Sequence, residues 1–177
     1  MAETLHHMSS EVAGLSVEQI AERYTARFID RYADWDAFAD ARTEGFKRAQ
    51  HRFIGAGGSG KHGDMRAIPP QGFTLSIMYV EPGQGNAAHT HEVEEAFFVL
   101  EGQLVAFFED SSGKRIDVKL GKWDCVACPA GVIHGYENQG LEPVYFQVML
   151  GRGTPELMGY KDSELLAQRD VHLREPR

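Results

Sequence analysis

The sequence predicts a mostly β fold, preceded by a helical segment and followed by a second, short helix. From Phe73 onward, short runs rich in β-branched and aromatic residues recur at regular intervals, and each run ends at residues that favour turns. The run RIDVKL, residues 115–120, alternates polar and apolar side chains, as a strand with one buried face does. Short strands in such regular succession are typical of an all-β barrel or sandwich.

Length and composition indicate a single globular domain. The chain has 177 residues, of which 42% are hydrophobic and 25% are charged, and a chain of this size buries a substantial core. We expect an N-terminal arm with an amphipathic helix over residues 1–50, a β-barrel over residues 51–155, and a C-terminal tail with a short helix over residues 156–177.

Charge and cysteine content exclude several classes of protein. The formal net charge of −8 argues against nucleic-acid binding, because no basic stripe is available to neutralise phosphates. No apolar run approaches the roughly 18 residues of a membrane-spanning helix, and the first residues lack the layout of a secretory signal. The two cysteines imply no disulfide framework. We therefore expect a cytoplasmic protein whose partners are neither nucleic acids nor membranes.

Ser16 and Gln19 form the pattern of a capping box, which predicts a helix that begins after Ser16. Over residues 17–35, apolar side chains recur at steps of three and four residues, the period of an amphipathic helix. They are Val17, Ile20, Ala21, Tyr24, Phe28 and Tyr32. We expect this helix to pack on the outside of the barrel or across a dimer partner, with a lid over a ligand as the alternative. Residues 155–170 are expected to contain the second helix.

The segment that organises the chain is GQGNAAHTHEVEEAFFVLEG, residues 83–102. It places His89, His91 and Glu95 at odd positions, and a β-strand directs every second side chain to the same face. The two histidines then lie about 6.6 Å apart along the strand, a gap that inward-reaching imidazoles can close around one ion. Glu95 joins them if the chain stays extended or bends gently, and His134 is the best candidate for a fourth ligand.

The same segment carries the spacing of a known motif. Gly83, His89, His91, Glu95 and Gly102 resemble, position for position, the first motif of the cupin superfamily. The second cupin motif is matched by Pro129, Gly131, His134 and Asn138. Trp123 stands where that motif opens with a glycine, and Gly121 lies two residues earlier. The resemblance implies a single jelly-roll β-barrel (a double-stranded β-helix) that holds one divalent metal ion through His89, His91, Glu95 and His134.

Three imidazoles and one carboxylate, without a thiolate, suit Fe²⁺, Mn²⁺, Ni²⁺, Co²⁺, Cu²⁺ or Zn²⁺. Four protein ligands leave two positions open on a six-coordinate ion, so a substrate can chelate it, or a substrate and O₂ can bind side by side. We expect a mostly apolar pocket around the ion, with Phe97, Tyr145 and Gln147 as candidate substrate contacts; Phe97 and Tyr145 also suit the core. His62 is a further candidate if the glycine-rich loop beside it covers the mouth of the barrel.

Two other motifs suggest chemistry that their surroundings do not favour. Residues 55–61, GAGGSGK, resemble a phosphate-binding loop, but His62 replaces the Ser or Thr that would follow, and two prolines interrupt any helix after it. Cys125 and Cys128 form a C-x-x-C pair on a predicted strand, where residues three apart face opposite sides and cannot readily grip one ion. We therefore expect residues 55–61 to form a flexible loop, and Cys125 and Cys128 to be small, semi-buried side chains.

Cupins with this ligand set are often Fe²⁺-dependent dioxygenases. The resemblance therefore implies oxygenation or oxidative cleavage of a small chelating molecule, such as a diketone, a thiol or a hydroxylated aromatic acid. The metal centre would carry the catalysis, and no separate catalytic residue is assigned. A metal-dependent isomerase or lyase of a carbonyl or sugar-like substrate, and a non-catalytic small-molecule-binding cupin, stay open as alternatives, because a fold does not fix a function. We also expect a homodimer, since such barrels commonly pair.

Overall fold

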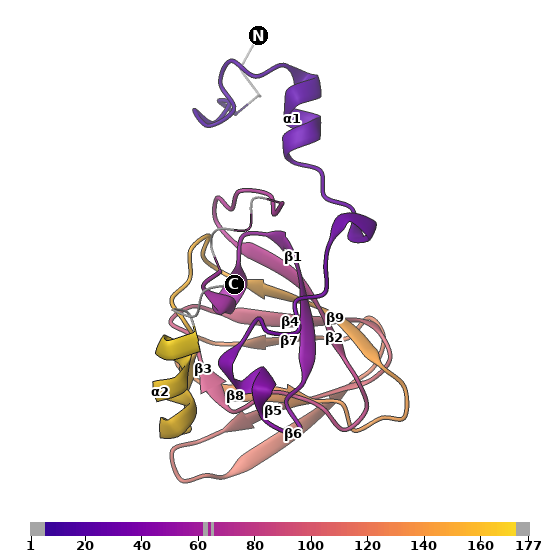
Figure 1. Cartoon of the computed structure of the whole chain (residues 1–177), viewed down its shortest axis with the longest axis vertical. Coiled ribbons are helices and arrows are strands. Elements are labelled where there is room, and N and C mark those ends of the chain that lie inside the picture. Colours follow the sequence, from indigo (N-terminus) through magenta and orange to yellow (C-terminus); the bar gives the residue numbers. More distant parts are fainter. Residues whose placement is uncertain (1–5, 62–63, 65, 173–177) are drawn as a thin grey trace.

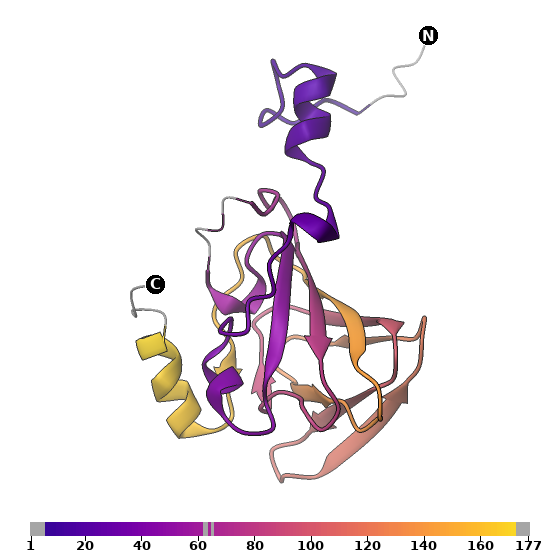
Figure 2. The ribbon, with the colours of Figure 1, turned by 45° about the vertical axis from the view of Figure 1, so that its right-hand side comes forward.

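Two five-stranded antiparallel sheets form the body of the protein. The computed structural model describes residues 6–61, 64 and 66–172, and Figures 1 and 2 show how the strands lie. The first sheet has the order β1 (Arg48–Ile54), β2 (Thr74–Val80), β9 (Val144–Leu150), β4 (Glu95–Glu101) and β7 (Cys125–Cys128). The second has the order β10 (Gly159–Tyr160), β3 (His89–Thr90), β8 (Ile133–Glu137), β5 (Leu104–Glu109) and β6 (Arg115–Leu120).

The hydrophobic core is built from the inner faces of both sheets. On β2, every second side chain from Thr74 to Val80 is buried, because successive side chains of a strand point to opposite faces. Core members of the first sheet are Met78, Val80, Phe97, Val99, Val144 and Phe146, and those of the second are Leu104, Ala106, Leu120 and Tyr136. The predicted all-β architecture is confirmed, but among the described strands the two sheets stay separate and do not join into the closed barrel that we expected.

Two turns depend on left-handed backbone conformations. Gly102, between β4 and β5, has φ 84°, and a Cβ atom there would lie 2.7 Å from the carbonyl oxygen of Pro143, so glycine is required. Trp123 has φ 74° and is the one non-glycine residue with positive φ in the described part of the chain. Its position is where the cupin motif has glycine, the residue that adopts a positive φ without strain.

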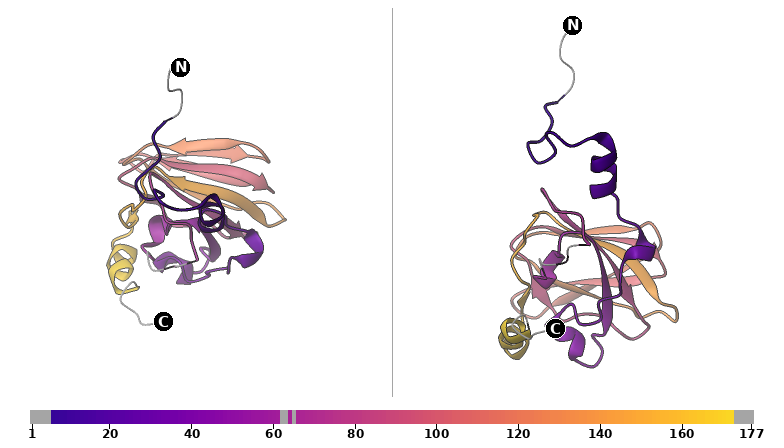
Figure 3. Two further views of the ribbon diagram at one scale, coloured as in Figure 1. Left: turned by 90° about the horizontal axis from the view of Figure 1, so that it is seen from above. Right: turned by 45° about the horizontal axis from the view of Figure 1, so that its top comes forward.

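The N-terminal helix is shorter than we predicted. α1 spans Val17–Arg23 and begins with the expected capping box, in which Ser16 accepts a bond from the Gln19 backbone. It buries no residue and stands apart from the sheets in Figures 1 to 3. The prediction of one helix over residues 17–35 that packs on the barrel is therefore wrong. Helices gain most of their stability from packing, and the later apolar residues of this run pack in another conformation.

The remainder of the arm lies along β1. A short 3₁₀ helix, η1 (Phe28–Asp30), places the ring of Phe28 4.8 Å from that of His51 and 6.2 Å from that of Tyr145. The next 3₁₀ helix, η2 (Ala39–Arg42), carries three buried residues, including Asp40. Residues 28–42 thus belong to the folded body, because they cover parts of the first sheet that would otherwise face water.

The C-terminal helix α2 spans Ser163–His172 and packs against η2. Figure 1 shows α2 in yellow beside the sheets. The helix buries Leu165. The expected short helix is present, although it starts later than residue 155 because Gly159 and Tyr160 pair with β3 as strand β10. Among the residues that the structure describes, no helix has the length and apolar character that crossing a bilayer would require.

Candidate metal centre

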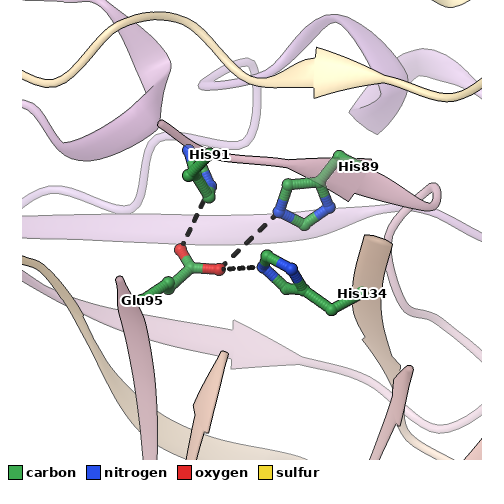
Figure 4. A group of neighbouring side chains, drawn as sticks. All are labelled: His89, His91, Glu95 and His134. Carbon is green, nitrogen blue, oxygen red and sulfur yellow. Dashed lines mark hydrogen bonds and ion pairs between the residues drawn. The ribbon is translucent and has the colours of Figure 1, made fainter. Parts of the chain in front are cut away.

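The four candidate ligands, far apart in the sequence, converge from both sheets. His89 lies on β3 and is the cross-strand partner of His134 on β8. Glu95 is the first residue of β4 in the other sheet. His91 follows β3, and its backbone carbonyl accepts a 2.9 Å hydrogen bond from the Gly131 backbone, so the turn of the second motif holds the loop of the first. Figure 4 shows the four side chains pointing toward one another.

The distances within this group fit one metal ion. The Glu95 carboxylate lies 2.9 Å from His134 Nε2, 3.4 Å from His91 Nε2 and 3.7 Å from His89 Nε2. All four ligand atoms lie within 4.8 Å of one another. Ligands bound at about 2.1 Å lie at most about 4.2 Å apart across the ion. Sub-ångström shifts of the side chains therefore suffice to close this group around an ion.

Backbone carbonyls set the tautomers of two of the histidines. His89 Nδ1 lies 2.9 Å from the Ala87 carbonyl oxygen, and His134 Nδ1 lies 2.7 Å from that of Val132. A carbonyl oxygen can only accept, so the Nδ1 atoms of His89 and His134 donate to these carbonyls; for His89 this bond is shorter than the 3.3 Å contact between its Nδ1 and the Asn86 amide nitrogen. With a metal bound, each ring would be neutral and would offer the lone pair of Nε2 to the ion. The hydrogen bond from Nδ1 to a carbonyl is the usual second contact of a metal-binding histidine.

His91 gives the clearest sign that a ligand is needed. Its side chain is buried, and among the described residues neither ring nitrogen makes a well-aligned hydrogen bond; Nε2 has only the 3.4 Å contact with Glu95. A buried polar atom without a partner is costly. An ion at Nε2, beside Glu95, would satisfy that atom. Gly58 lies against the same ring, where a Cβ atom would come within 2.8 Å of His91 Cε1.

The electrostatics of the group favour a cation. Burial opposes charge on Glu95, but the three neighbouring histidines outweigh burial and hold the pKa of its carboxyl well below the usual value. Burial likewise opposes charge on His134, yet the bond to Glu95 raises the pKa of that imidazole. Burial lowers the pKa of His89 and keeps it neutral. The ion-free centre thus holds a carboxylate whose charge attracts a proton or, equally, a metal ion.

His89, His91 and Glu95 line a cavity of about 20 Å³, which is room for about one water molecule. Its wall includes Arg48, Gln50 and Ser76 from β1 and β2, together with Asn86 and Tyr136. The apolar surface that we expect of this pocket is supplied by Phe38, Met78, Val148 and Met158. We do not single out its polar residues from the sequence. Their sequence signal is the alternation of Thr74 and Ser76 with larger apolar residues on β2, and of Arg48, Gln50 and Arg52 on β1.

The expected substrate contacts lie elsewhere. Phe97 is fully buried and packs on Tyr136 and Phe146, with its ring 6.1 Å from that of His134, so it belongs to the core. Tyr145 and Gln147 pair with outward-facing residues of β2 and do not line the cavity. The expectation that they face inward is wrong, because Val144, Phe146 and Val148 take the inner face of β9. His62 lies outside the described residues.

The glycine-rich loop lies at the centre. Gly57 and Gly58 belong to the short 3₁₀ helix η3 (Gly57–Ser59) and line the cavity. Lys61 Nζ bonds Asp34 at 2.9 Å, and this partner identifies a structural role for the lysine. The glycine-rich loop thus lies over the metal cavity, as we considered for the case in which it covers the mouth of the barrel.

The two cysteines are free and unlike each other. Cys125 is exposed and Cys128 is buried, so the expectation that both are semi-buried is wrong for Cys125, because residues three apart on a strand face opposite sides. Cys128 pairs with Glu95 across β7 and β4, and burial raises the pKa of its thiol. The C-x-x-C pair therefore forms neither a disulfide nor a joint metal site.

Comparisons with known proteins agree with this geometry. Residues 76–150 match the family model of the cupin domain. A germin-like protein of Arabidopsis thaliana (subfamily 2 member 1) is 40% identical over 73 residues, which cover 41% of this chain and 33% of the relative. The rhicadhesin receptor of Pisum sativum is 34% identical over the same length. The chain thus spans about a third of the length of the curated relatives it matches.

Solved structures share the fold at low sequence identity. The polyketide cyclase RemF from Streptomyces resistomycificus superposes with a TM-score of 0.58 at 19% identity, covering 80% of this chain and 89% of that one. An oxalate oxidase structure superposes with a TM-score of 0.58 at 16% identity, covering 87% of this chain and 68% of that one. Residues 76–150 thus match a cupin domain, and the buried cluster of three histidines and a glutamate could hold a divalent metal ion.

Proposed function

We propose that this cupin is a mononuclear metal enzyme whose ion is held by His89, His91, Glu95 and His134. The observation that carries the proposal is the buried His91 ring, whose nitrogens make no well-aligned hydrogen bond among the described residues and whose Nε2 lies within reach of three further ligand atoms. Glu95 supplies negative charge in a buried setting, where a cation is favoured. The carbonyls of Ala87 and Val132 hold two of the imidazoles in the tautomer that a metal needs.

We further propose that the ion is Fe²⁺ and that the enzyme is a dioxygenase of a small chelating organic molecule. Bound Fe²⁺ would supply Lewis acidity and O₂ chemistry at its open positions. The chain's own residues support a small substrate, because the cavity is narrow and Gly57 and Gly58 close it on one side. Polar groups of Gln50, Ser76 and Asn86 line the wall and offer hydrogen bonds that would orient a polar substrate.

The test is O₂ consumption by the Fe²⁺-loaded chain, measured across diketones, thiols and hydroxylated aromatic acids. We expect uptake that depends on the substrate, stops when Fe²⁺ is removed, and is absent in His134→Ala, which loses one ligand. Turnover of a carbonyl substrate at an equal rate without O₂, with Zn²⁺ or Mn²⁺ in the site, would replace the dioxygenase by an isomerase or lyase. Substrate binding without turnover under any condition would identify a non-catalytic binding protein.

A further inference from the structure

Two buried arginines on β1 differ in how many of their guanidinium nitrogens have hydrogen-bond partners. Arg48 and Arg52 lie four residues apart on the same strand and are 1% and 3% exposed. Each nitrogen of the Arg52 guanidinium has a partner: Nε and Nη1 bond Asp64 and Asp34, and Nη2 bonds the hydroxyl of Tyr32. Arg52 is thus fully engaged with the protein.

Arg48 is engaged on two of its three nitrogens. Nη1 donates to the Phe46 carbonyl and Nη2 donates to Asp40 Oδ1, both at 2.8 Å. In the described part of the chain, Nε has no hydrogen-bond partner. A buried charged group with a donor that makes no hydrogen bond destabilises the fold. Arg48 also lines the metal cavity beside Tyr136, whose hydroxyl interacts with the guanidinium, whereas Arg52 does not line it. A ligand oxygen in the cavity could therefore be a partner for Nε.

A short chain of hydrogen bonds connects Arg48 to the metal ligand His89. Asp40, which binds Arg48 with one oxygen, accepts a 2.9 Å bond from the Ala87 backbone with the other. The Ala87 carbonyl then accepts from His89 Nδ1 at 2.9 Å. The guanidinium is thereby fixed relative to His89, as a group that binds a ligand together with the ion must be.

The charges around the cavity favour an anion. Arg48 and Asp40 cancel each other, and three neutral histidines with one carboxylate leave a divalent ion with a net charge of about +1. In a buried site this excess is best balanced by a ligand that carries one negative charge. A guanidinium N–H is also a strong donor to carboxylate oxygen.

We infer that Arg48 is a substrate-binding residue whose Nε–H receives one oxygen of a small carboxylate, while the same ligand occupies an open position on the ion. This inference rests on the proposed metal site and specifies the class of its substrate. It gives the cavity two fixed contact points, the ion and Arg48, and selects carboxylates over neutral molecules of equal size.

The experiment uses the full chain loaded with Co²⁺, whose visible absorption changes when a ligand enters its coordination sphere. Formate and its neutral counterpart formamide are titrated into the wild type, Arg48→Lys and Arg52→Lys. Lysine keeps the charge beside Asp40 but removes the Nε–H group of the guanidinium. We expect formate affinity to fall about tenfold or more in Arg48→Lys and to stay unchanged in Arg52→Lys, with formamide binding weakly to all three.

The outcomes separate the two proposals. Equal formate affinity in Arg48→Lys and the wild type, with Co²⁺ bound to both, would overturn the role of Arg48 and leave the metal site intact. Failure of the wild type to bind Co²⁺ would overturn both. If Arg48→Lys does not fold, the double variant Arg48→Gln with Asp40→Asn removes the ion pair as a unit and keeps an acceptor for Ala87. That variant should lose the preference for formate over formamide, and retention of the preference would overturn the inference.

Discussion

At the scale of single residues, each candidate ligand is held by a second contact that also controls its proton. His89 and His134 donate from Nδ1 to backbone carbonyls, and Glu95 faces all three imidazoles. Spacing in the sequence predicted which residues meet, because strand parity and the second motif both converge on them. The tautomers depend on carbonyls of residues 87 and 132, whose directions no sequence pattern reports.

Replacement of Glu95 by glutamine tests the charge of the centre. Glu95→Gln keeps the size of the side chain but removes its negative charge, so we expect Zn²⁺ affinity to fall at least about tenfold. Isothermal titration calorimetry measures this directly. Glu94→Gln is the matched control, because Glu94 is the exposed neighbour of Glu95 and should bind Zn²⁺ as the wild type does. Equal loss in both variants would mean that the effect is not specific to the centre.

The pH dependence of metal binding follows from His134. Glu95 raises the pKa of this imidazole above its ordinary value of 6.5 in the ion-free protein. The His134–Glu95 contact therefore stabilises the ion-free fold below pH 6.5, and this contribution is lost as pH rises through the higher folded-state pKa. Protons compete with metal in the same acidic range. We expect Zn²⁺ affinity to drop about tenfold per pH unit below the pKa; constant affinity between pH 8 and pH 5.5 would contradict this.

At the scale of elements, the glycine-rich loop lines the site, whereas the turn at Trp123 bonds Val99 of β4 and lies outside it. The sequence predicted the strands around both motifs, because alternation and turn residues are local signals. It did not predict where α1 would end, since Phe28 gains more by packing on β1 than by extending a helix that has no partner. The polar inner face of β1 was also missed, because its polar residues are satisfied only by contacts with distant segments.

The backbone strain at Trp123 can be measured by comparing its glycine and alanine variants. Trp123 has φ 74°, which costs a non-glycine residue about 1 kcal/mol. Trp123→Gly and Trp123→Ala both lose the ring contact with Phe98, but only glycine relieves the backbone. We expect Trp123→Gly to be more stable than Trp123→Ala by about 1 kcal/mol, measured by urea unfolding. Equal stability of the two variants would show that the turn is unstrained.

The loop over the metal centre is tested at Gly58. A methyl group there would lie 2.8 Å from His91 Cε1 and 3.1 Å from Met158 Cγ, so the imidazole must move from its place among the ligands. We expect Gly58→Ala to lower Zn²⁺ affinity about tenfold, while Gly72→Ala, where a Cβ atom meets nothing within 4 Å, should bind normally. Normal binding by Gly58→Ala would show that this loop does not constrain His91.

At the scale of the whole molecule, the two sheets bring ligands from distant parts of the chain to one buried point. β3 and β8 supply His89 and His134 from one sheet, and β4 supplies Glu95 from the other, so the centre exists only in the folded chain. The arm divides into residues 28–42, which pack on the body, and α1, which buries nothing. The homodimer that we predicted stays a prediction, and the apolar side chains of α1 are where a second copy would pack.

The most direct measurement is elemental analysis of the full chain purified without chelators or added metals, beside the His134→Ala variant prepared in the same way. If four side chains from two sheets hold an ion, the wild type retains about one transition-metal ion per chain and the variant retains far less. A wild-type chain that carries no metal and binds none when Fe²⁺, Mn²⁺, Co²⁺ or Zn²⁺ is supplied would contradict the metal centre and the function proposed for it.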